Sequence, residues 1–291
     1  MADLAGINLA MQTPFHEDSS INYARWEELI DIYIDAGVHG LVFGSGTGQH
    51  PYLSEEESNR LYELGLKRVN GRCKVICQSS ALNMEEIVRR SRHSEDHGAD
   101  ALMILPPYLE GPDDDDGLFE FYREIDAAIS TDIVGYNIPQ ATGLSVSPAL
   151  LDRLGDLPNF NYIKDSSGDM TIHQVYLRNK KVRLLNGADT TAVFSFMAGA
   201  YGSIWGGANY MPHECVKLWD LVQAGDHAGA LELWKKMEPS LSWIWRHNYF
   251  SAVKSAVRVR GYEGGSVRKP QRPLSEQEER EFFETLACLD A

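Results

Sequence analysis

Basic residues are scarce in this chain, which has 27 Lys and Arg against 42 Asp and Glu and a formal net charge of −15. Nucleic acids and anionic membrane surfaces are bound by clustered basic residues, so we expect neither as a partner. The expected partner is a small molecule. An anionic one would need a pocket made locally favourable by backbone N–H groups or a helix N-terminus.

Cysteine is also sparse, with four residues scattered from Cys73 to Cys288. So few cysteines build no disulfide framework, and the spacing of Cys73 and Cys77 suits neither a zinc knuckle nor a redox pair. We therefore expect reduced thiols in a cytoplasmic protein. The first residues lack both a basic segment and a sustained apolar run, so we expect no secretory signal.

Residues 190–213 contain no Asp, Glu, Lys or Arg and imitate a membrane span. Four glycines, an asparagine and a proline interrupt the segment, and its hydrophobicity is modest for a span. We expect instead a buried helix, turn and strand.

Strand-like and helix-like segments alternate along most of the chain. In residues 22–36 the apolar positions recur at helical spacing, and short apolar runs that end in turns separate such helices. Eight strands with helices between them predict a closed (β/α)8 TIM barrel, with an open doubly wound sheet as the alternative. The expected strands are 7–13, 39–44, 74–78, 101–105, 132–136, 161–164, 182–185 and 202–205.

The pattern becomes all-helical after about residue 212. We expect a barrel over residues 1–212 and a C-terminal helical region over 213–291 packed on it. The expected helices of this extension are 213–223, 227–237, 241–261 and 275–289.

Chemically active side chains recur where the predicted strands end, which is where barrel enzymes place their catalytic groups. Lys164 ends the sixth strand, and a lysine in such a place is unusual because burying an unpaired ammonium is costly. A desolvated lysine can attack a carbonyl carbon and form a Schiff base. Tyr136 ends the fifth strand, and the glycine-rich loop 44–49 follows the second. Each signal is weak alone, but the ordered set points to catalysis.

The chain resembles the dihydrodipicolinate synthase/N-acetylneuraminate lyase superfamily of class I pyruvate-dependent lyases. The resemblance extends over nearly the whole chain and is specific to the superfamily rather than to one reaction. It rests on Thr13-Pro14-Phe15, the loop 44–49, Tyr136-Asn137-Ile138-Pro139, Lys164 to Asp169, Gly187-Ala188-Asp189, Gly202-Ser203-Ile204, Ala208-Asn209 and Arg268-Lys269-Pro270.

The resemblance implies a covalent imine on Lys164 with a 2-oxo acid such as pyruvate, and no separate cofactor. Tyr136 would be the general acid and base, and Thr47, with Ser45 and the N–H groups around Gly46 and Gly48, would hold the substrate carboxylate. It also implies a homodimer or homotetramer in which Tyr108 approaches a neighbouring active site. The other expected substrate contacts are Ser166, Gly187, Asp189 and Ile204.

Two departures bear on the reaction. The superfamily's dihydrodipicolinate synthases have a relay threonine where this chain has Gly46, and an arginine that grips the aldehyde's carboxylate where it has Ala141. We therefore place 4-hydroxy-tetrahydrodipicolinate synthase activity behind reversible aldol cleavage of a 2-keto-3-deoxy sugar acid, or a similar compound, to pyruvate and an aldehyde. Thr190 replaces an acidic residue of sialate lyases, which argues against sialic acid. The usual glutamate of the glycine loop is Gln49.

Two alternatives stay open: a 2-keto-3-deoxy sugar acid dehydratase, and a barrel that binds a 2-oxo acid without catalysis. His93 and His97 have the spacing of a zinc pair on one helix face. The helix lacks an HExxH motif, so we expect a solvated pair and no catalytic metal.

Overall fold

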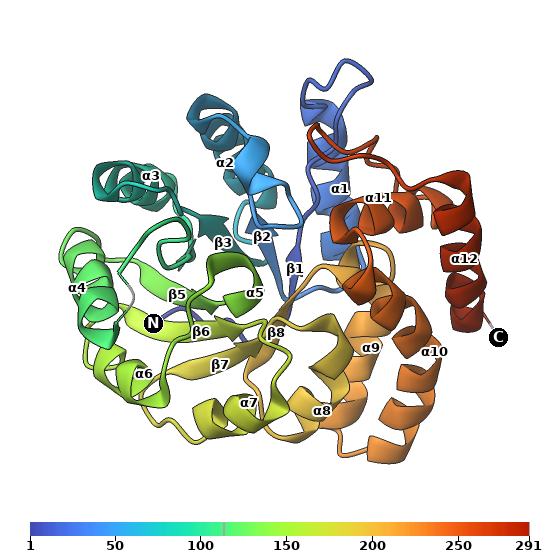
Figure 1. The fold of residues 1–291 in the computed structure, drawn as a ribbon. Helices are drawn as coiled ribbons and strands as arrows, with labels where there is room; N and C mark the ends of the chain where they lie inside the picture. Colours follow the sequence, from blue (N-terminus) through green and yellow to red (C-terminus); the bar gives the residue numbers. More distant parts are fainter. Residues whose placement is uncertain (113, 291) are drawn as a thin grey trace.

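The computed structural model describes residues 1–112 and 114–290, and its centre is a closed barrel of eight parallel strands (Figure 1). Each strand pairs with the next one along the chain, and β1 pairs with β8, which excludes the open sheet. The strands are β1 Gly6–Ala10, β2 Gly40–Phe43, β3 Lys74–Gln78, β4 Ala101–Ile104, β5 Asp132–Asn137, β6 Phe160–Asp165, β7 Arg183–Asn186 and β8 Gly202–Trp205.

Helices surround this barrel, and the sequence sets their ends. Ser54 forms a capping box with Glu57 at the start of α2, and Asn83 accepts a hydrogen bond from the Glu86 N–H at the start of α3. Such caps satisfy N–H groups that have no partner inside the helix. The outer helices are α1 Tyr23–Asp35, α2 Glu55–Val69, α3 Met84–Asp96, α4 Asp115–Asp126, α6 Pro148–Leu154, α7 Met170–Leu177 and α8 Ala192–Met197.

Short helical segments follow several strands, and the last one, η4, follows a helix of the C-terminal region. They are the 3-10 turns η1 His50–Tyr52, η2 Asp189–Thr191, η3 Gly207–Asn209 and η4 Ala287–Leu289, and the helix α5 Pro139–Thr142.

The strands are buried on both faces, as a barrel wrapped in helices requires. Side chains that point inward form a separate apolar cluster inside the barrel, and the outward ones pack against the helices. The inner cluster includes Val42, Ile76, Met103, Val134, Tyr162, Leu185 and Ile204.

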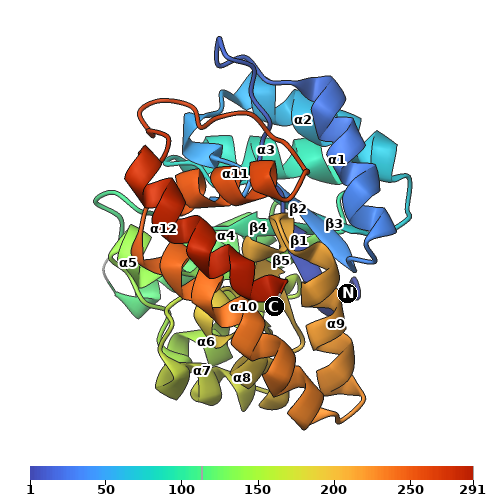
Figure 2. The same cartoon turned by 90° about the vertical axis from the view of Figure 1, so that its right-hand side faces the viewer.

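The C-terminal helices are α9 Pro212–Gln223, α10 His227–Arg246, α11 Tyr249–Val259 and α12 Glu276–Leu286. Figure 2 shows α12 lying across α10 and α11, which it contacts. The predicted break between 237 and 241 is wrong: Pro239 lies inside α10, and the break comes at His247 and Asn248. Asn248 caps α11 by accepting a hydrogen bond from Ser251 N–H. The first of these helices, α9, packs directly on the barrel strand β1. The division of the chain at residue 212 stays a prediction.

Two further expectations concern the length of β1 and the uncharged segment 190–213. β1 is shorter than expected. Met11 N–H still donates to the Val42 carbonyl of β2, but Gln12 N–H donates to Asn209 Oδ1, and Thr13 Oγ1 donates to the Gly48 carbonyl. Residues 190–213 form η2, α8, β8, η3 and the start of α9, as a buried part of the barrel. None of the helices in the described residues is long and apolar enough to cross a membrane.

Candidate active site

A cavity of about 430 Å³ opens at the carboxyl ends of the strands. Every strand from β3 to β8 contributes a residue at or just past its end, and the loop after β2 adds two more. These residues are Gly46, Thr47, Gln78, Leu105, Tyr136, Lys164, Gly187 and Ile204.

Lys164 and Tyr136 lie side by side in this cavity. They face each other in the register of β5 and β6, and both are buried, at 5% and 7% exposure. Lys164 Nζ lies 4.0 Å from the centroid of the Tyr136 ring. No carboxylate of the described residues forms an ion pair with this ammonium. A buried lysine that faces a cavity without a salt-bridge partner is available to a ligand.

Gly187 makes room for the lysine side chain. A Cβ at this position would lie 2.7 Å from Lys164 Cε and 2.2 Å from Ser166 Oγ, so any side chain would displace both. Ser166 also donates a long hydrogen bond, 3.5 Å, to the Tyr136 hydroxyl. The four residues Tyr136, Lys164, Ser166 and Gly187 therefore form one packed group, and their catalytic and substrate-binding roles stay predictions.

The glycine-rich loop divides into two parts. Gly46 and Thr47 line the cavity, whereas Ser45 and Gly48 do not: Ser45 is fully buried, and its hydroxyl accepts a hydrogen bond from the Gly48 N–H. A Cβ on Gly46 would meet nothing within 4 Å, so packing does not require glycine there. The fold would therefore tolerate a threonine at position 46, and the absence of its hydroxyl changes only the lining of the cavity.

Gln49 joins this loop to the C-terminal region. Its backbone is left-handed, and its buried side-chain amide donates to the Arg268 carbonyl and accepts from the Arg268 N–H, at 3.2 and 3.1 Å. An ionised glutamate could only accept. A glutamine at position 49, unlike the usual glutamate, can therefore form both hydrogen bonds with the Arg268 backbone.

Asp189 is buried at the rim of the cavity and held by two donors. The Tyr249 hydroxyl lies 3.0 and 3.1 Å from its two oxygens, and Gly207 N–H donates at 2.9 Å. Burial raises the pKa of Asp189, and the hydrogen bonds and the nearby Lys164 charge counter this only in part. Asp189 and Ile204 both line the cavity, as expected.

Sequence reasoning missed the wall that the C-terminal helices supply. Trp245 from α10, with Tyr249 and Phe250 from α11, lines the cavity. Nothing in their local sequence separates them from helix-packing aromatics, because only the docking of these helices brings them to the strand ends. His50 and Gln78 were also missed, although both come from the barrel: His50 begins η1 after β2, and Gln78 ends β3, so their positions at strand ends were the signal that could have found them.

A buried hydrogen-bonded network supports the strand end behind Lys164. His173 Nδ1 lies 2.8 Å from Asp165 Oδ2, and its Nε2 lies 2.7 Å from Ser195 Oγ. Asn137 donates to the other oxygen of Asp165. Burial raises the pKa of Asp165, but the hydrogen bonds from His173 and Asn137 outweigh it and hold that pKa below its usual value. Because this network is buried, it positions the strand and does not itself face a ligand.

Tyr108 does not line the cavity of its own chain. It is half-buried in the loop after β4, next to the exposed Leu109. Its expected approach to a neighbouring subunit stays a prediction.

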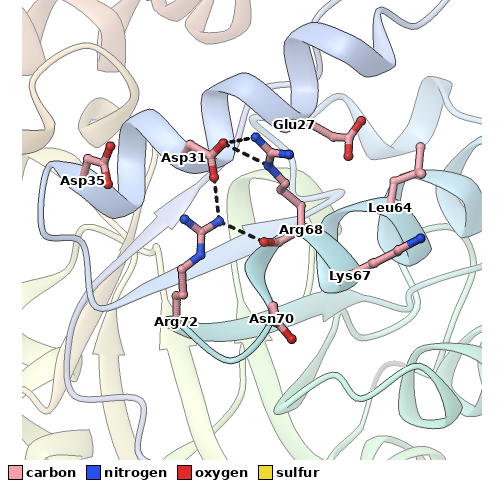
Figure 3. A pocket seen from close by; sticks show the side chains of 8 residues that line it. All are labelled: Glu27, Asp31, Asp35, Leu64, Lys67, Arg68, Asn70 and Arg72. Atoms are coloured by element: carbon pink, nitrogen blue, oxygen red, sulfur yellow. Dashed lines mark hydrogen bonds and ion pairs between the residues drawn. The ribbon is translucent and has the colours of Figure 1, made fainter.

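A second hollow lies between α1 and α2 (Figure 3). Asp31 sits between two arginines there, and accepts from Arg68 Nε at 2.9 Å and from Arg72 at 2.6 Å. Because this carboxylate is already neutralised, the hollow is a solvated ion-pair network rather than a catalytic cavity.

A buried lysine beside a tyrosine, in a cavity at the carboxyl ends of a (β/α)8 barrel, is the arrangement of a lyase of the class I aldolase type. Comparison with known proteins agrees. The sequence model of the dihydrodipicolinate synthetase family matches residues 3–288, and the chain belongs to this family. Its members form a Schiff base between pyruvate and a lysine and use no external cofactor.

Three relatives show how far the similarity extends. The chain is 28% identical to 4-hydroxy-tetrahydrodipicolinate synthase of Bacillus subtilis (strain 168), over 99% of this chain and 100% of that protein. It is 31% identical to the enzyme of the same name from Methanoculleus marisnigri, over 97% and 98%. The crystal structure of the chloride-inhibited dihydrodipicolinate synthase from Acinetobacter baumannii, complexed with pyruvate, superposes with a TM-score of 0.94 at 27% identity, over 99% of each chain.

Proposed function

We propose that this enzyme reversibly cleaves a 2-keto-3-deoxy sugar acid, or a similar 2-oxo acid, to pyruvate and an uncharged aldehyde through an imine on Lys164. The observation that carries the proposal is the position of Lys164 Nζ, buried in the cavity and 4.0 Å from the Tyr136 ring centroid. Its neutral amine attacks the keto carbon, and the resulting carbinolamine loses water to give the imine.

The protonated imine then serves as the electron sink. Tyr136 first gives its proton to the carbinolamine hydroxyl that leaves as water, and the resulting phenolate then takes the proton of the substrate's C4 hydroxyl. The C3–C4 bond breaks, and its electron pair moves into an enamine as the aldehyde leaves. The enamine is protonated at C3, and water releases pyruvate and restores the lysine. Ser166, 3.5 Å from the Tyr136 hydroxyl, is positioned to pass the proton onward.

The substrate carboxylate would be bound at Thr47 and the backbone N–H groups of its loop. Thr47 Oγ1 is one of the atoms packed against Gly206, where a Cβ would lie 2.8 Å from it and 2.1 Å from the Tyr249 hydroxyl. The missing side chain at Gly206 thus leaves both hydroxyls close to the space beside Lys164.

The charge of the cavity supports an uncharged aldehyde. Lys164 is the one cationic side chain among the described residues that line it, because burial lowers the pKa of His50 to about 4 and leaves that ring neutral near pH 7. Ala141 occupies the place of the arginine that grips a second carboxylate. The wall beyond Lys164 is largely apolar and includes Leu105, Ile138, Trp245 and Phe250.

The names of the relatives favour the synthase reaction, whereas Gly46 and Ala141 favour a different aldehyde. At 28–31% identity the family is shared, but the identity of the second substrate is set by these few side chains. We therefore place the synthase reaction behind aldol cleavage and behind the dehydratase alternative.

The first test is borohydride reduction in the presence of pyruvate, followed by peptide mass spectrometry. We expect one pyruvate adduct on Lys164 and none in a Lys164→Ala variant. Lys254 is an internal control: it is also buried, and burial lowers its pKa well below the usual value. Its Nζ, however, donates to the Thr13 and Gly264 carbonyls outside the cavity. An adduct on Lys254, or none on Lys164, would refute the imine assignment.

The second test identifies the reaction. Wild-type enzyme is incubated with a panel of 2-keto-3-deoxy acids and of pyruvate–aldehyde pairs, and pyruvate release is compared with loss of water. Dehydration without pyruvate release would establish the dehydratase alternative. An adduct on Lys164 without turnover of any compound would establish a non-catalytic, 2-oxo-acid-binding barrel.

The departures from the synthase pattern can be tested by reversing them. A Gly46→Thr/Ala141→Arg variant should accept an aldehyde that bears a carboxylate at least about 10-fold better than wild type, since a bidentate arginine pair is a strong carboxylate contact. Its rate with uncharged aldehydes serves as the reference. If wild type already prefers the carboxylate-bearing aldehyde, the synthase reading replaces ours.

The cytoplasmic location and the assembly as a homodimer or homotetramer complete this proposal. Sedimentation equilibrium measures the assembly directly, and a Tyr108→Ala variant that loses activity only in the assembled enzyme would support its role at a neighbouring site.

A further inference from the structure

Helices α2 and α3 are neighbours on the outside of the barrel (Figure 1). Three side chains with metal-binding atoms meet between them. They are Glu63 from α2 and His93 and His97 from α3 and its C-cap. One ligand atom from each lies within 4.8 Å of those of the other two. None of the three lines the cavity that holds Lys164. The histidine pair was visible in the sequence, but the carboxylate that completes it lies 30 residues earlier and comes near only when the helices pack.

The distances are close to those of a metal site. His93 Nε2 lies 3.2 Å from Glu63 Oε1, and His97 Nε2 lies 3.9 Å from the same oxygen. Nitrogen and oxygen ligands of tetrahedral Zn²⁺, at roughly 2.0–2.2 Å from the ion, are about 3.3–3.5 Å apart. The His93–Glu63 distance therefore already fits, and the His97–Glu63 distance needs a side-chain shift of about half an ångström. The two histidine nitrogens lie within 4.8 Å of each other and would also move closer on binding an ion.

The ring nitrogens are oriented as ligands. His97 Nδ1 lies 2.7 Å from the His93 carbonyl, which can only accept, so Nδ1 carries a proton. In the neutral ring the lone pair is then on Nε2, the nitrogen on the side of Glu63. Metal-bound histidines commonly make this hydrogen bond from the second nitrogen. His93 Nε2 is shielded from solvent and makes no hydrogen bond within the part of the chain that the structure describes.

The neighbouring arginines of α3 have partners other than these three ligands. Arg89, one turn before His93 on the same face of α3, forms an ion pair with Glu55 of α2 at 2.7 Å. The two arginines closer to His93 along α3 also have partners: Arg90 pairs with Glu86, and Arg92 donates to the Ala128 carbonyl. Glu63 and His97 have side-chain exposures of 46% and 41%, so an ion from solution can reach the site.

We propose that Glu63, His93 and His97 form a binding site for a Zn²⁺-class transition-metal ion that links α2 to α3. Two imidazoles and one carboxylate suit Zn²⁺, whereas Ca²⁺ and Mg²⁺ favour sets made of oxygen ligands. Water would fill the fourth position. The site stabilises the helical layer of the barrel and takes no part in the chemistry at Lys164.

The experiment is a calorimetric titration of ZnCl₂ into chelator-treated enzyme, combined with thermal unfolding. We expect one ion per chain and a melting temperature raised by about 5 °C when zinc is 100-fold above its Kd. His93→Ala and His97→Ala should each weaken binding by more than about 100-fold, because even the supporting partners of a ligand contribute about 10–100-fold. His16→Ala, which removes an exposed histidine elsewhere, is the matched control.

Three results would overturn the proposal: no zinc binding by wild type, binding unchanged in both α3 variants, or an equal loss in the His16→Ala control. Circular dichroism of the apo variants checks that each is folded. Glu63→Gln keeps the shape of the side chain and removes its charge, and should weaken binding by about 10-fold or more. Pyruvate trapping on Lys164 should be the same in all variants, with and without zinc, so this test stands apart from that of the proposed function.

Discussion

The Tyr249–Asp189 pair allows a prediction whose size and pH dependence both follow from the structure. Asp189 is buried and accepts hydrogen bonds from the Tyr249 hydroxyl and from Gly207 N–H. Tyr249→Phe removes one donor and leaves the ring in place. A hydrogen bond to a charged group contributes about 1.5–3 kcal/mol, so we expect the free energy of unfolding to fall by about this amount near neutral pH.

The sign of the pH dependence follows from the Asp189 carboxyl. Burial raises its pKa above the usual 3.8, so the folded state binds more protons than the unfolded state above pH 3.8, and stability falls as pH rises through this window. Loss of the tyrosine donor raises this pKa further. The cost of Tyr249→Phe should therefore be largest near neutral pH. As the pH falls and the folded-state carboxyl takes up its proton, the cost should shrink to that of a neutral hydrogen bond, about 1 kcal/mol.

The assay is urea unfolding of wild type and variant, followed by tryptophan fluorescence between about pH 4.5 and 8. Tyr33→Phe is the matched control, because the Tyr33 hydroxyl is also buried but donates to the neutral Asn209 carbonyl at 3.2 Å. Its cost should stay the same across the range. A Tyr249→Phe cost that is equally flat would refute the reasoning about Asp189.

Two further variants address the support of Lys164. Gly187→Ala places a methyl group 2.7 Å from Lys164 Cε and should slow pyruvate trapping about 100-fold, since a displacement of 1 Å can cost that much; trapping at the wild-type rate would contradict the packing described here. His173→Leu leaves the buried carboxylate of Asp165 without its main donor and should lower the free energy of unfolding by about 3–5 kcal/mol. Urea unfolding measures this, and a loss below about 1 kcal/mol would show that the network is dispensable.

The barrel was predictable because its signals are local. Apolar runs of strand length alternate with helical spacing, and turn residues separate them, so seven of the eight strand positions could be read closely from the sequence. β1 and α10 show the limits. β1 ends early because Asn209, which follows the neighbouring strand β8 but is distant in sequence, takes the Gln12 N–H. Pro239 suggested a helix end, but the packing of α10 against α9 and α12 keeps the helix continuous.

The site was predictable to the same extent. Tyr136, Lys164 and Gly187 end consecutive strands, so barrel geometry alone brings them together. Trp245, Tyr249 and Phe250 come from helices whose docking no local pattern encodes. Ser45 and Gly48 resemble ligand-binding residues in sequence, yet within the loop they hydrogen-bond to each other and do not line the cavity. Whether a loop residue lines the cavity or supports the loop depends on the direction of its side chain, and the spacing of residues in the sequence does not determine that direction.

The pairing of β1 with β8 has a consequence for folding during translation. Gly6 meets Gly202 in this pairing, so about two-thirds of the chain must leave the ribosome before β1 gains its second neighbour. At about 5–20 residues per second, this leaves one edge of an apolar strand open for roughly 10–40 s. Unpaired strand edges template aggregation. A cell that makes this enzyme must therefore shield an incomplete barrel during that interval, and slowing translation beyond residue 202 should be harmless where slowing it earlier is not.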